Sequence, residues 1–157
     1  MFRLLLLICC LSLGSFQTAK DRYIVATFGK VNWFQANQIC HKSNMILATV
    51  TNYEQQLLLI HSIAANGHLL GQEGFWLGAS NLGDLNAWTW QGLGIPLGYK
   101  KWGNNEPQMN LIGTEGCMVM GLDQSWYSVD CYSEYYFVCE RACNSTNDPL
   151  YIKKIYI

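Results

Sequence analysis

The sequence predicts an α+β domain in which two helices near the start precede a series of short strands. Apolar residues recur at helical spacing in two segments before residue 67, and the later segments are short, apolar and separated by turn residues. Between Gln91 and Gly116 the chain has little regular pattern, and a loop of that length in a compact domain is usually functional. The expected architecture is therefore two helices flanking small antiparallel sheets, with a long irregular loop for binding.

Both helices have recognisable ends. Asn32 and Gln35 can form a capping box at the start of the first helix, and Thr51 with Glu54 can do the same for the second. Asn66-Gly67 is expected to end the second helix. The predicted buried faces are Trp33, Ala36 and Cys40 in the first helix and Tyr53, Leu57, Ile60 and Ala64 in the second.

Six segments are predicted to be strands because they are short, apolar and rich in aromatic or β-branched residues. They are 22–26, 75–79, 87–90, 117–122, 125–129 and 135–140.

The start of the chain is typical of a secretory signal peptide. A basic start, Met1-Phe2-Arg3, precedes an apolar run from Leu4 to Leu13, and cleavage is expected after Gly14 or Ala19. A membrane anchor is disfavoured because a run of about 10 residues is too short for a bilayer that needs ~20. The expected organisation is a signal peptide at 1–19, one domain at 20–141 and a C-terminal tail at 142–157, in an exported protein.

Charge and motif content exclude two classes of function. The formal net charge is −1, so the chain lacks the basic surplus of a nucleic-acid-binding protein. No histidine lies in a motif with a nucleophile, and no carboxylate pair has a recognisable catalytic spacing. The sequence therefore predicts a binding protein and not an enzyme.

Five cysteines remain after removal of the signal peptide, which is an odd number that permits several disulfide pairings. A zinc site is disfavoured because no Cys-x-x-Cys occurs and the three histidines are not at ligand spacing.

A series of motifs in the second half of the chain resembles the C-type lectin domain family. The resemblance covers roughly Tyr23 to Glu140, and no single motif is specific, but six occur in order at suitable spacing. The clearest are Trp76-Leu77-Gly78-Ala79, Ala87-Trp88-Thr89-Trp90, Glu106-Pro107-Gln108, Glu115-Gly116-Cys117, Trp126 with Cys131, and Phe137-Val138-Cys139-Glu140.

This resemblance implies two disulfides, Cys40–Cys139 and Cys117–Cys131. Cys143 is then left over, which suggests an intermolecular bond and a homodimer. Asn144-Ser145-Thr146 is the single N-glycosylation sequon in the chain.

The resemblance also implies a ligand site. Glu106, Gln108 and Glu115 occupy positions where the family supplies oxygen ligands to calcium and hydrogen bonds to sugar hydroxyls. Tyr127 is expected at the surface as a further sugar contact, whereas Trp126 is expected in the core. Where the family continues with Trp-Asn-Asp, this chain has Trp126-Tyr127-Ser128, so calcium binding is expected to be weak or absent. Asp130 does not replace the lost acid, because two positions along a strand move it about 6–7 Å.

The expected function is that of an exported lectin that binds glycans on cells or microbes, as in innate immunity, without insertion into membranes. Glu-Pro-Asn accompanies mannose-type sugars in the family and Gln-Pro-Asp galactose-type sugars, and Glu-Pro-Gln is neither. A second hypothesis retains the fold but assigns its loops to binding another protein without calcium.

Overall fold

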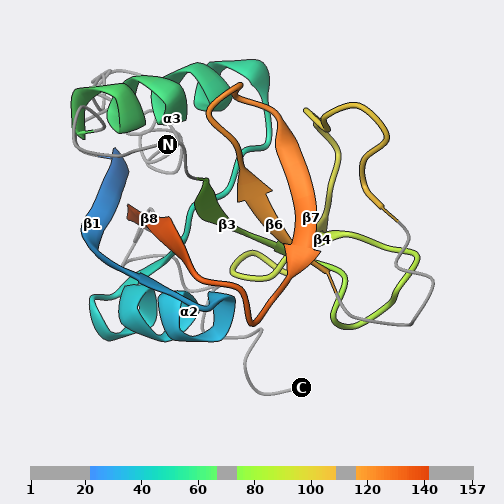
Figure 1. Cartoon of the computed structure of the whole chain (residues 1–157), viewed down its shortest axis with the longest axis horizontal. Helices are drawn as coiled ribbons and strands as arrows, with labels where there is room; N and C mark the ends of the chain where they lie inside the picture. The colour runs from blue at the N-terminus through green and yellow to red at the C-terminus, as the bar shows by residue number, and fades with distance from the viewer. Residues whose placement is uncertain (1–21, 67–73, 109–115, 142–157) are drawn as a thin grey trace, which may run out of the picture.

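The structure is a computed structural model that describes residues 22–66, 74–108 and 116–141 (Figure 1). The segments predicted to be a signal peptide and a C-terminal tail lie outside the described residues. Within the described residues, no helix is both long and apolar enough to cross a membrane. The elements in chain order are β1 (Tyr23–Val31), α2 (Trp33–Lys42), β2 (Met45–Leu47), α3 (Tyr53–Asn66), β3 (Phe75–Ser80), β4 (Thr89–Trp90), β5 (Ile95–Pro96), β6 (Gly116–Met120), β7 (Trp126–Asp130) and β8 (Tyr135–Arg141).

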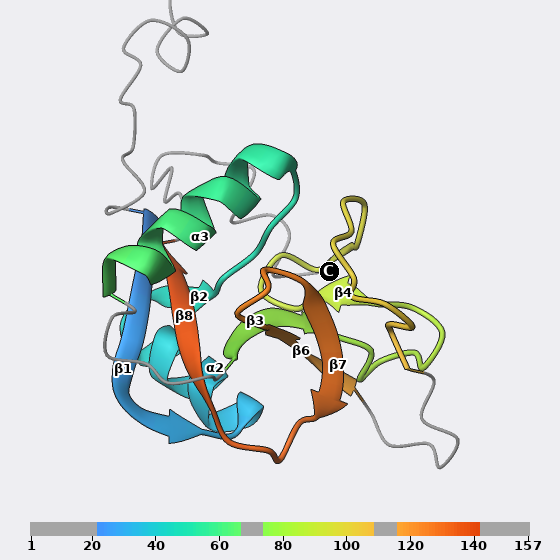
Figure 2. The same ribbon diagram turned by 45° about the horizontal axis from the view of Figure 1, so that its top comes forward.

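The sheet brings the two ends of the domain together. β1 pairs antiparallel with β8, so that Tyr23 lies opposite Glu140. β3 pairs parallel with β8 and antiparallel with β6, and β6 forms a hairpin with β7. Helices α2 and α3 lie on opposite sides of the β1–β8 pair, and the β6–β7 hairpin stands beside it (Figures 1 and 2). The predicted α+β class is confirmed.

The first helix agrees with the prediction at both its cap and its buried face. The Asn32 side chain accepts a hydrogen bond from Gln35 N at 2.9 Å, and the Gln35 side chain accepts one from Asn32 N at 3.2 Å. Trp33, Ala36 and Cys40 are buried. The Trp33 indole also donates to Leu77 O at 2.9 Å, which fixes α2 against β3.

The second helix begins one residue later than predicted and buries a different face. Its cap is Asn52, which accepts from Gln55 N at 2.9 Å, and not Thr51. Tyr53, Leu57 and Ala64 of the predicted stripe are exposed, and Ile60 is only partly buried. The residues that are buried are Gln56, Leu59, Ser62 and Ile63. The predicted stripe is wrong because it contained apolar residues only, whereas the buried face also includes the polar residues Gln56 and Ser62.

Gln56 explains this error in physical terms. Its side chain is buried because both ends of the amide have partners: Nε2 donates to Gln124 O at 3.0 Å, and Oε1 accepts from the Trp126 indole at 3.2 Å. A buried amide with hydrogen-bond partners at both ends is tolerated in a protein core. The buried face of α3 is thus selected by the contact of Gln56 with Trp126 in β7, which lies 70 residues further along the chain.

The six predicted strands are all present, with ends that differ by a few residues. β1 is longer than predicted and continues to Val31, whereas β4 contains only Thr89 and Trp90. The two strands that were not predicted, β2 and β5, have three and two residues, so their sequences carry no alternation to detect.

Both disulfides implied by the resemblance are confirmed. Cys40–Cys139 joins α2 to β8 with a Cα–Cα distance of 5.5 Å, and Cys117–Cys131 joins the two ends of the β6–β7 hairpin at 5.0 Å. The sulfur atoms lie in the core, where Cys40 and Cys117 are fully buried.

Strands β6 and β7 separate two apolar clusters. Met118, Met120 and Trp126 belong to the cluster under α3, whereas Cys117 and Val119 point to the opposite side and pack in the cluster beside α2. This alternation follows from the two-residue period of a strand. It also places the side chains of Tyr127 and Ser128, which follow Trp126, on opposite faces of β7.

Candidate functional site

The loop that carries Glu106 is attached to the outer edge of β7. Trp126 N donates to Lys101 O at 2.8 Å, and Gly103 N donates to Trp126 O at 2.9 Å. Trp102 packs edge-on against the buried Trp126 ring, with 6.1 Å between ring centroids. Trp126 itself is fully buried, as predicted. The residues that follow Gly103 therefore start from a fixed place beside β7.

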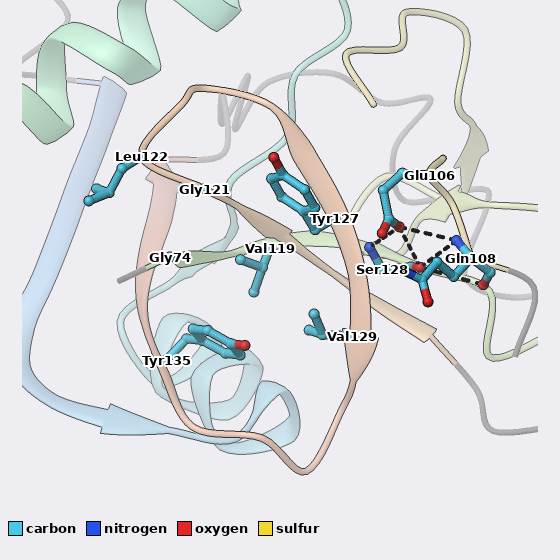
Figure 3. A pocket seen from close by; sticks show the side chains of 10 residues that line it. All are labelled: Gly74, Glu106, Gln108, Val119, Gly121, Leu122, Tyr127, Ser128, Val129 and Tyr135. Carbon is cyan, nitrogen blue, oxygen red and sulfur yellow. Dashed lines mark hydrogen bonds between the residues drawn. The ribbon is translucent and has the colours of Figure 1, made fainter. Parts of the chain in front are cut away.

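The Glu106 carboxylate is the centre of a hydrogen-bond cluster with Ser128 and Gln108. Its Oε2 atom accepts from Ser128 N at 2.9 Å, from Ser128 Oγ at 2.7 Å and from Gln108 N at 3.1 Å (Figure 3). Gln108 N also donates to Ser128 Oγ at 2.9 Å. The Glu106–Pro107 peptide bond is cis. The loop is thus closed onto β7 by protein groups alone.

Several polar groups of the same loop remain uncommitted. Within the described residues, Glu106 Oε1 and the side-chain amides of Asn104, Asn105 and Gln108 have no hydrogen-bond partner in the protein. The three amide side chains are exposed. The arrangement therefore presents one free carboxylate oxygen and three free amides from a backbone that is already fixed.

Tyr127 lies beside this loop in a defined position. Its hydroxyl donates to Asp123 Oδ2 at 2.6 Å. Its ring lies so close to Gly103 and Gly121 that a Cβ atom added at either glycine would come within 2.8 Å or 2.9 Å of a ring carbon. The hydrogen bond to Asp123 is also the largest cause that raises the Tyr127 pKa, and in return it lowers the Asp123 pKa.

The described side chains do not fit a calcium site of the kind the family forms. Ser128 acts as a hydrogen-bond donor to Glu106 at the position where the family supplies a carboxylate, and the Tyr127 hydroxyl is directed to Asp123. Asp130 Oδ1 accepts from Tyr132 N at 3.0 Å. No group of three or more His, Cys, Asp or Glu side chains within the described residues is placed to hold a metal ion. Calcium sites combine several carboxylate and carbonyl oxygens with water, and in the described part of this loop Glu106 Oε1 is the uncommitted carboxylate oxygen.

An open groove of about 690 Å³ passes along β7. Glu106, Gln108 and Ser128 line its polar end. Figure 3 shows Tyr127, Val119, Val129 and Tyr135 on the other side of the β7 ribbon, where they form an apolar part. Leu122, in the turn between β6 and β7, also lines the groove and is 52% exposed.

The structure therefore brings three of the four predicted sugar contacts, Glu106, Gln108 and Tyr127, to one groove. The fourth, Glu115, lies outside the described residues, as do Cys143 and Asn144. Sequence reasoning missed Ser128 and Asp123. The feature that could have identified Ser128 is a hydroxyl at the position of the family's acid. For Asp123 it is an Asp-x-Ser turn, in which the Asp123 carboxylate accepts a hydrogen bond from Ser125 N.

Two helices around a sheet that joins both ends of the domain, two disulfides, and a long loop fixed to β7 together define a C-type lectin-like domain. The family described as Lectin C-type domain matches residues 29–141, and the chain belongs to this family. As a member of this family, the protein has a carbohydrate-recognition fold and is not an enzyme.

Individual proteins agree with this assignment. The chain is 29% identical over 130 residues to C-type lectin mosGCTL-7 of the mosquito Culex quinquefasciatus. This match covers 77% of this chain and 75% of that protein. The carbohydrate-recognition domain of mouse scavenger receptor C-type lectin has the same fold, with a TM-score of 0.65 and 22% identity over 76% of this chain and 90% of that chain. A calcium-independent type II antifreeze protein also has a similar fold, with a TM-score of 0.63 and 23% identity. This match covers 76% of this chain and 85% of that chain.

Proposed function

We propose that this protein is an exported lectin that binds neutral hexoses of the mannose or galactose type without needing calcium. The observation that carries the proposal is the closed cluster at Glu106. The Ser128 hydroxyl and two backbone N–H groups hold one carboxylate oxygen, while the other oxygen and the Gln108 amide stay free for a ligand. A sugar site needs such fixed polar groups together with an aromatic surface, and Tyr127 supplies that surface.

The polar groups match the chemistry of a sugar. Each hydroxyl of a hexose both donates and accepts, so it can bond a carboxylate oxygen and an amide at the same time. Glu106 Oε1 accepts, and the amides of Asn104, Asn105 and Gln108 do both. We further propose that Glu115, which follows the same loop, contributes an additional carboxylate.

The ends of the chain support an extracellular role. The apolar leader at residues 1–19 directs export, and Asn144 carries an N-linked glycan in the exported protein. Once residues 1–19 are removed, Cys143 is the cysteine left outside the two disulfides of the domain, so we propose that it forms the bond of a covalent homodimer. The targets would then be glycans on cell or microbial surfaces, which two sites per dimer bind with higher avidity than one.

A glycan array probed in calcium and again in chelator tests the proposal, with the mature wild-type protein compared to Gln108→Ala. Binding to the same neutral glycans is expected in both conditions, with a marked loss in the variant. Gln38→Ala, an exposed glutamine on α2, is the matched control and should bind as the wild type does. Binding that disappears in chelator would contradict the calcium-independent site.

A protein-binding module is the second candidate, and exposed aromatic side chains favour it. Phe28 is 76% exposed and Tyr132 is 72% exposed, and Phe34 packs against Tyr132 with 5.4 Å between ring centroids. Exposed aromatic residues are enriched at protein–protein interfaces. No glycan binding in either condition, with a partner protein captured by the wild type but not by Phe28→Ser with Tyr132→Ser, would select this function.

A further inference from the structure

The groove along β7 has an apolar part that hexose hydroxyls alone would not use. On the face of β7 opposite Ser128, Val119, Val129 and Tyr135 line the groove, and Leu122 borders it (Figure 3). The volume of about 690 Å³ exceeds what one hexose fills and lies within the range of about 300–1,000 Å³ that is usual for small-molecule sites. The same groove therefore offers a polar end for a sugar and an apolar part for a second group.

The walls of the apolar part are already in place. Tyr135 packs edge-on against the fully buried Trp76, with 5.0 Å between ring centroids. Tyr127 is held by Asp123 and by the two glycines that its ring covers. Among the described apolar lining residues, only Leu122 is largely exposed, at 52%. A ligand would thus meet a preformed surface and would not have to order it, which lowers the entropic cost of binding.

The charges around the groove restrict the ligand. Among the described lining residues, Glu106 is the only charged one, and no Lys, Arg or His takes part. Asp123 adds a second carboxylate beside Tyr127. Sulfated, phosphorylated or carboxylated ligands, and anionic membrane surfaces, are therefore disfavoured by repulsion without a compensating cation. The groove matches a neutral, soluble ligand that is polar at one end and apolar at the other.

We propose that the ligand is a neutral glycoside with an apolar aglycone, whose sugar meets Glu106 and Gln108 and whose aglycone covers Val129, Tyr135 and Leu122. This inference rests on the proposed lectin function and adds the class of ligand. Each methylene group that leaves water tightens binding about fourfold, so an aglycone with two or three buried methylenes should gain roughly tenfold or more over a methyl glycoside.

Calorimetry on the mature full chain tests this with methyl and n-hexyl α-D-mannosides and β-D-galactosides. The hexyl form of the bound sugar is expected to bind at least about tenfold more tightly than the methyl form. Saturation-transfer NMR should show transfer to the hexyl methylenes. Leu122→Asn and the nearly isosteric Val129→Thr should each lower the hexyl-to-methyl affinity ratio. Leu85→Asn, which changes a leucine of similar exposure at 51% outside the groove, should leave that ratio unchanged.

Each other outcome overturns the inference in a recognisable way. Equal affinity for methyl and hexyl glycosides would leave the lectin function standing and remove the apolar subsite. Binding of n-hexanol as tight as that of the hexyl glycosides would show an apolar site without sugar recognition. Binding of neither glycoside, in a protein that also fails on the glycan array, would reject the lectin function and the inference together.

Discussion

The Ser128 hydroxyl donates to Glu106 Oε2 at 2.7 Å and accepts from Gln108 N at 2.9 Å, so it links β7 to both ends of the Glu-Pro-Gln triplet. A serine therefore holds the loop at the position where the family normally has a metal-binding acid. The consequence is a loop whose shape depends on the hydroxyl group, and this dependence can be measured.

Ser128→Ala is expected to lower the free energy of unfolding by about 1 kcal/mol. The substitution removes a hydrogen bond to an ionised group and leaves the Ser128 backbone N–H in place, and such bonds contribute about 1.5–3 kcal/mol where they are well shielded from water. Because this site is partly exposed, water weakens the bond and its contribution falls below that range, to about 1 kcal/mol. Urea unfolding of the mature protein gives the value.

Ser43→Ala is the control for that experiment, since Ser43 is an exposed residue at the end of α2 whose backbone, and not its side chain, makes the cap hydrogen bonds. Its effect should stay within about 0.5 kcal/mol. A Ser128→Ala variant as stable as this control would show that the cluster does not hold the loop.

Gln56→Leu is expected to destabilise the fold by about 2 kcal/mol or more. The substitution leaves the buried Trp126 indole N–H without its acceptor, and a buried polar group without a partner costs about 1–3 kcal/mol. It also removes the hydrogen bond to Gln124 O. Gln38→Leu on the exposed face of α2 is the matched control. Equal unfolding midpoints for the two variants would contradict a stabilising role for the buried amide.

The contrast between α2 and α3 indicates which parts of the fold the sequence could predict. The cap and buried face of α2 follow from residues within one or two helical turns, and the prediction was confirmed. The face of α3 depends on Gln56 meeting Trp126, a contact between distant segments that no local pattern encodes. β2 and β5 were missed for the same reason, because such short strands exist only through their partners.

The candidate site divides in the same way. Glu106, Gln108 and Tyr127 were found because the loop resembles a known motif, and the structure brings them to one groove. The donor role of Ser128 depends on how the loop lies on β7, and the apolar part of the groove depends on the pairing of Val119 with Tyr127 across two strands. These are three-dimensional relationships, so a motif identifies the loop but not its internal bonds.

Calcium is expected to change the melting temperature of the wild-type protein by less than about 1 °C at millimolar concentration. A ligand at 100 times its Kd would instead add about 2.7 kcal/mol, which corresponds to several degrees in a domain of this size. Differential scanning fluorimetry with calcium and with chelator measures the shift.

Tyr127→Asn combined with Ser128→Asp restores the family's ligand types and provides the comparison for the calcium experiment. This double variant should respond more strongly to calcium than the wild type. A shift of several degrees in the wild type that is lost in Glu106→Ala would show that the loop holds calcium in spite of its substitutions.

Tyr127→Phe is expected to remove part of the stability of the wild type in a pH-dependent way. The hydrogen bond from Tyr127 is the largest cause that lowers the Asp123 pKa from its ordinary value of 3.8. A carboxylate whose pKa is lower in the folded state stabilises the fold above its unfolded pKa, and this contribution is lost as pH falls through the folded value. The stability difference between wild type and Tyr127→Phe should therefore be constant from about pH 5 to 7 and shrink below about pH 4.

Urea unfolding at a series of pH values measures this stability difference. The control is Tyr132→Phe, which changes an exposed tyrosine on the turn after β7. A difference that stays constant down to pH 3, or one that Tyr132→Phe reproduces, would show that the Tyr127–Asp123 hydrogen bond does not stabilise the fold.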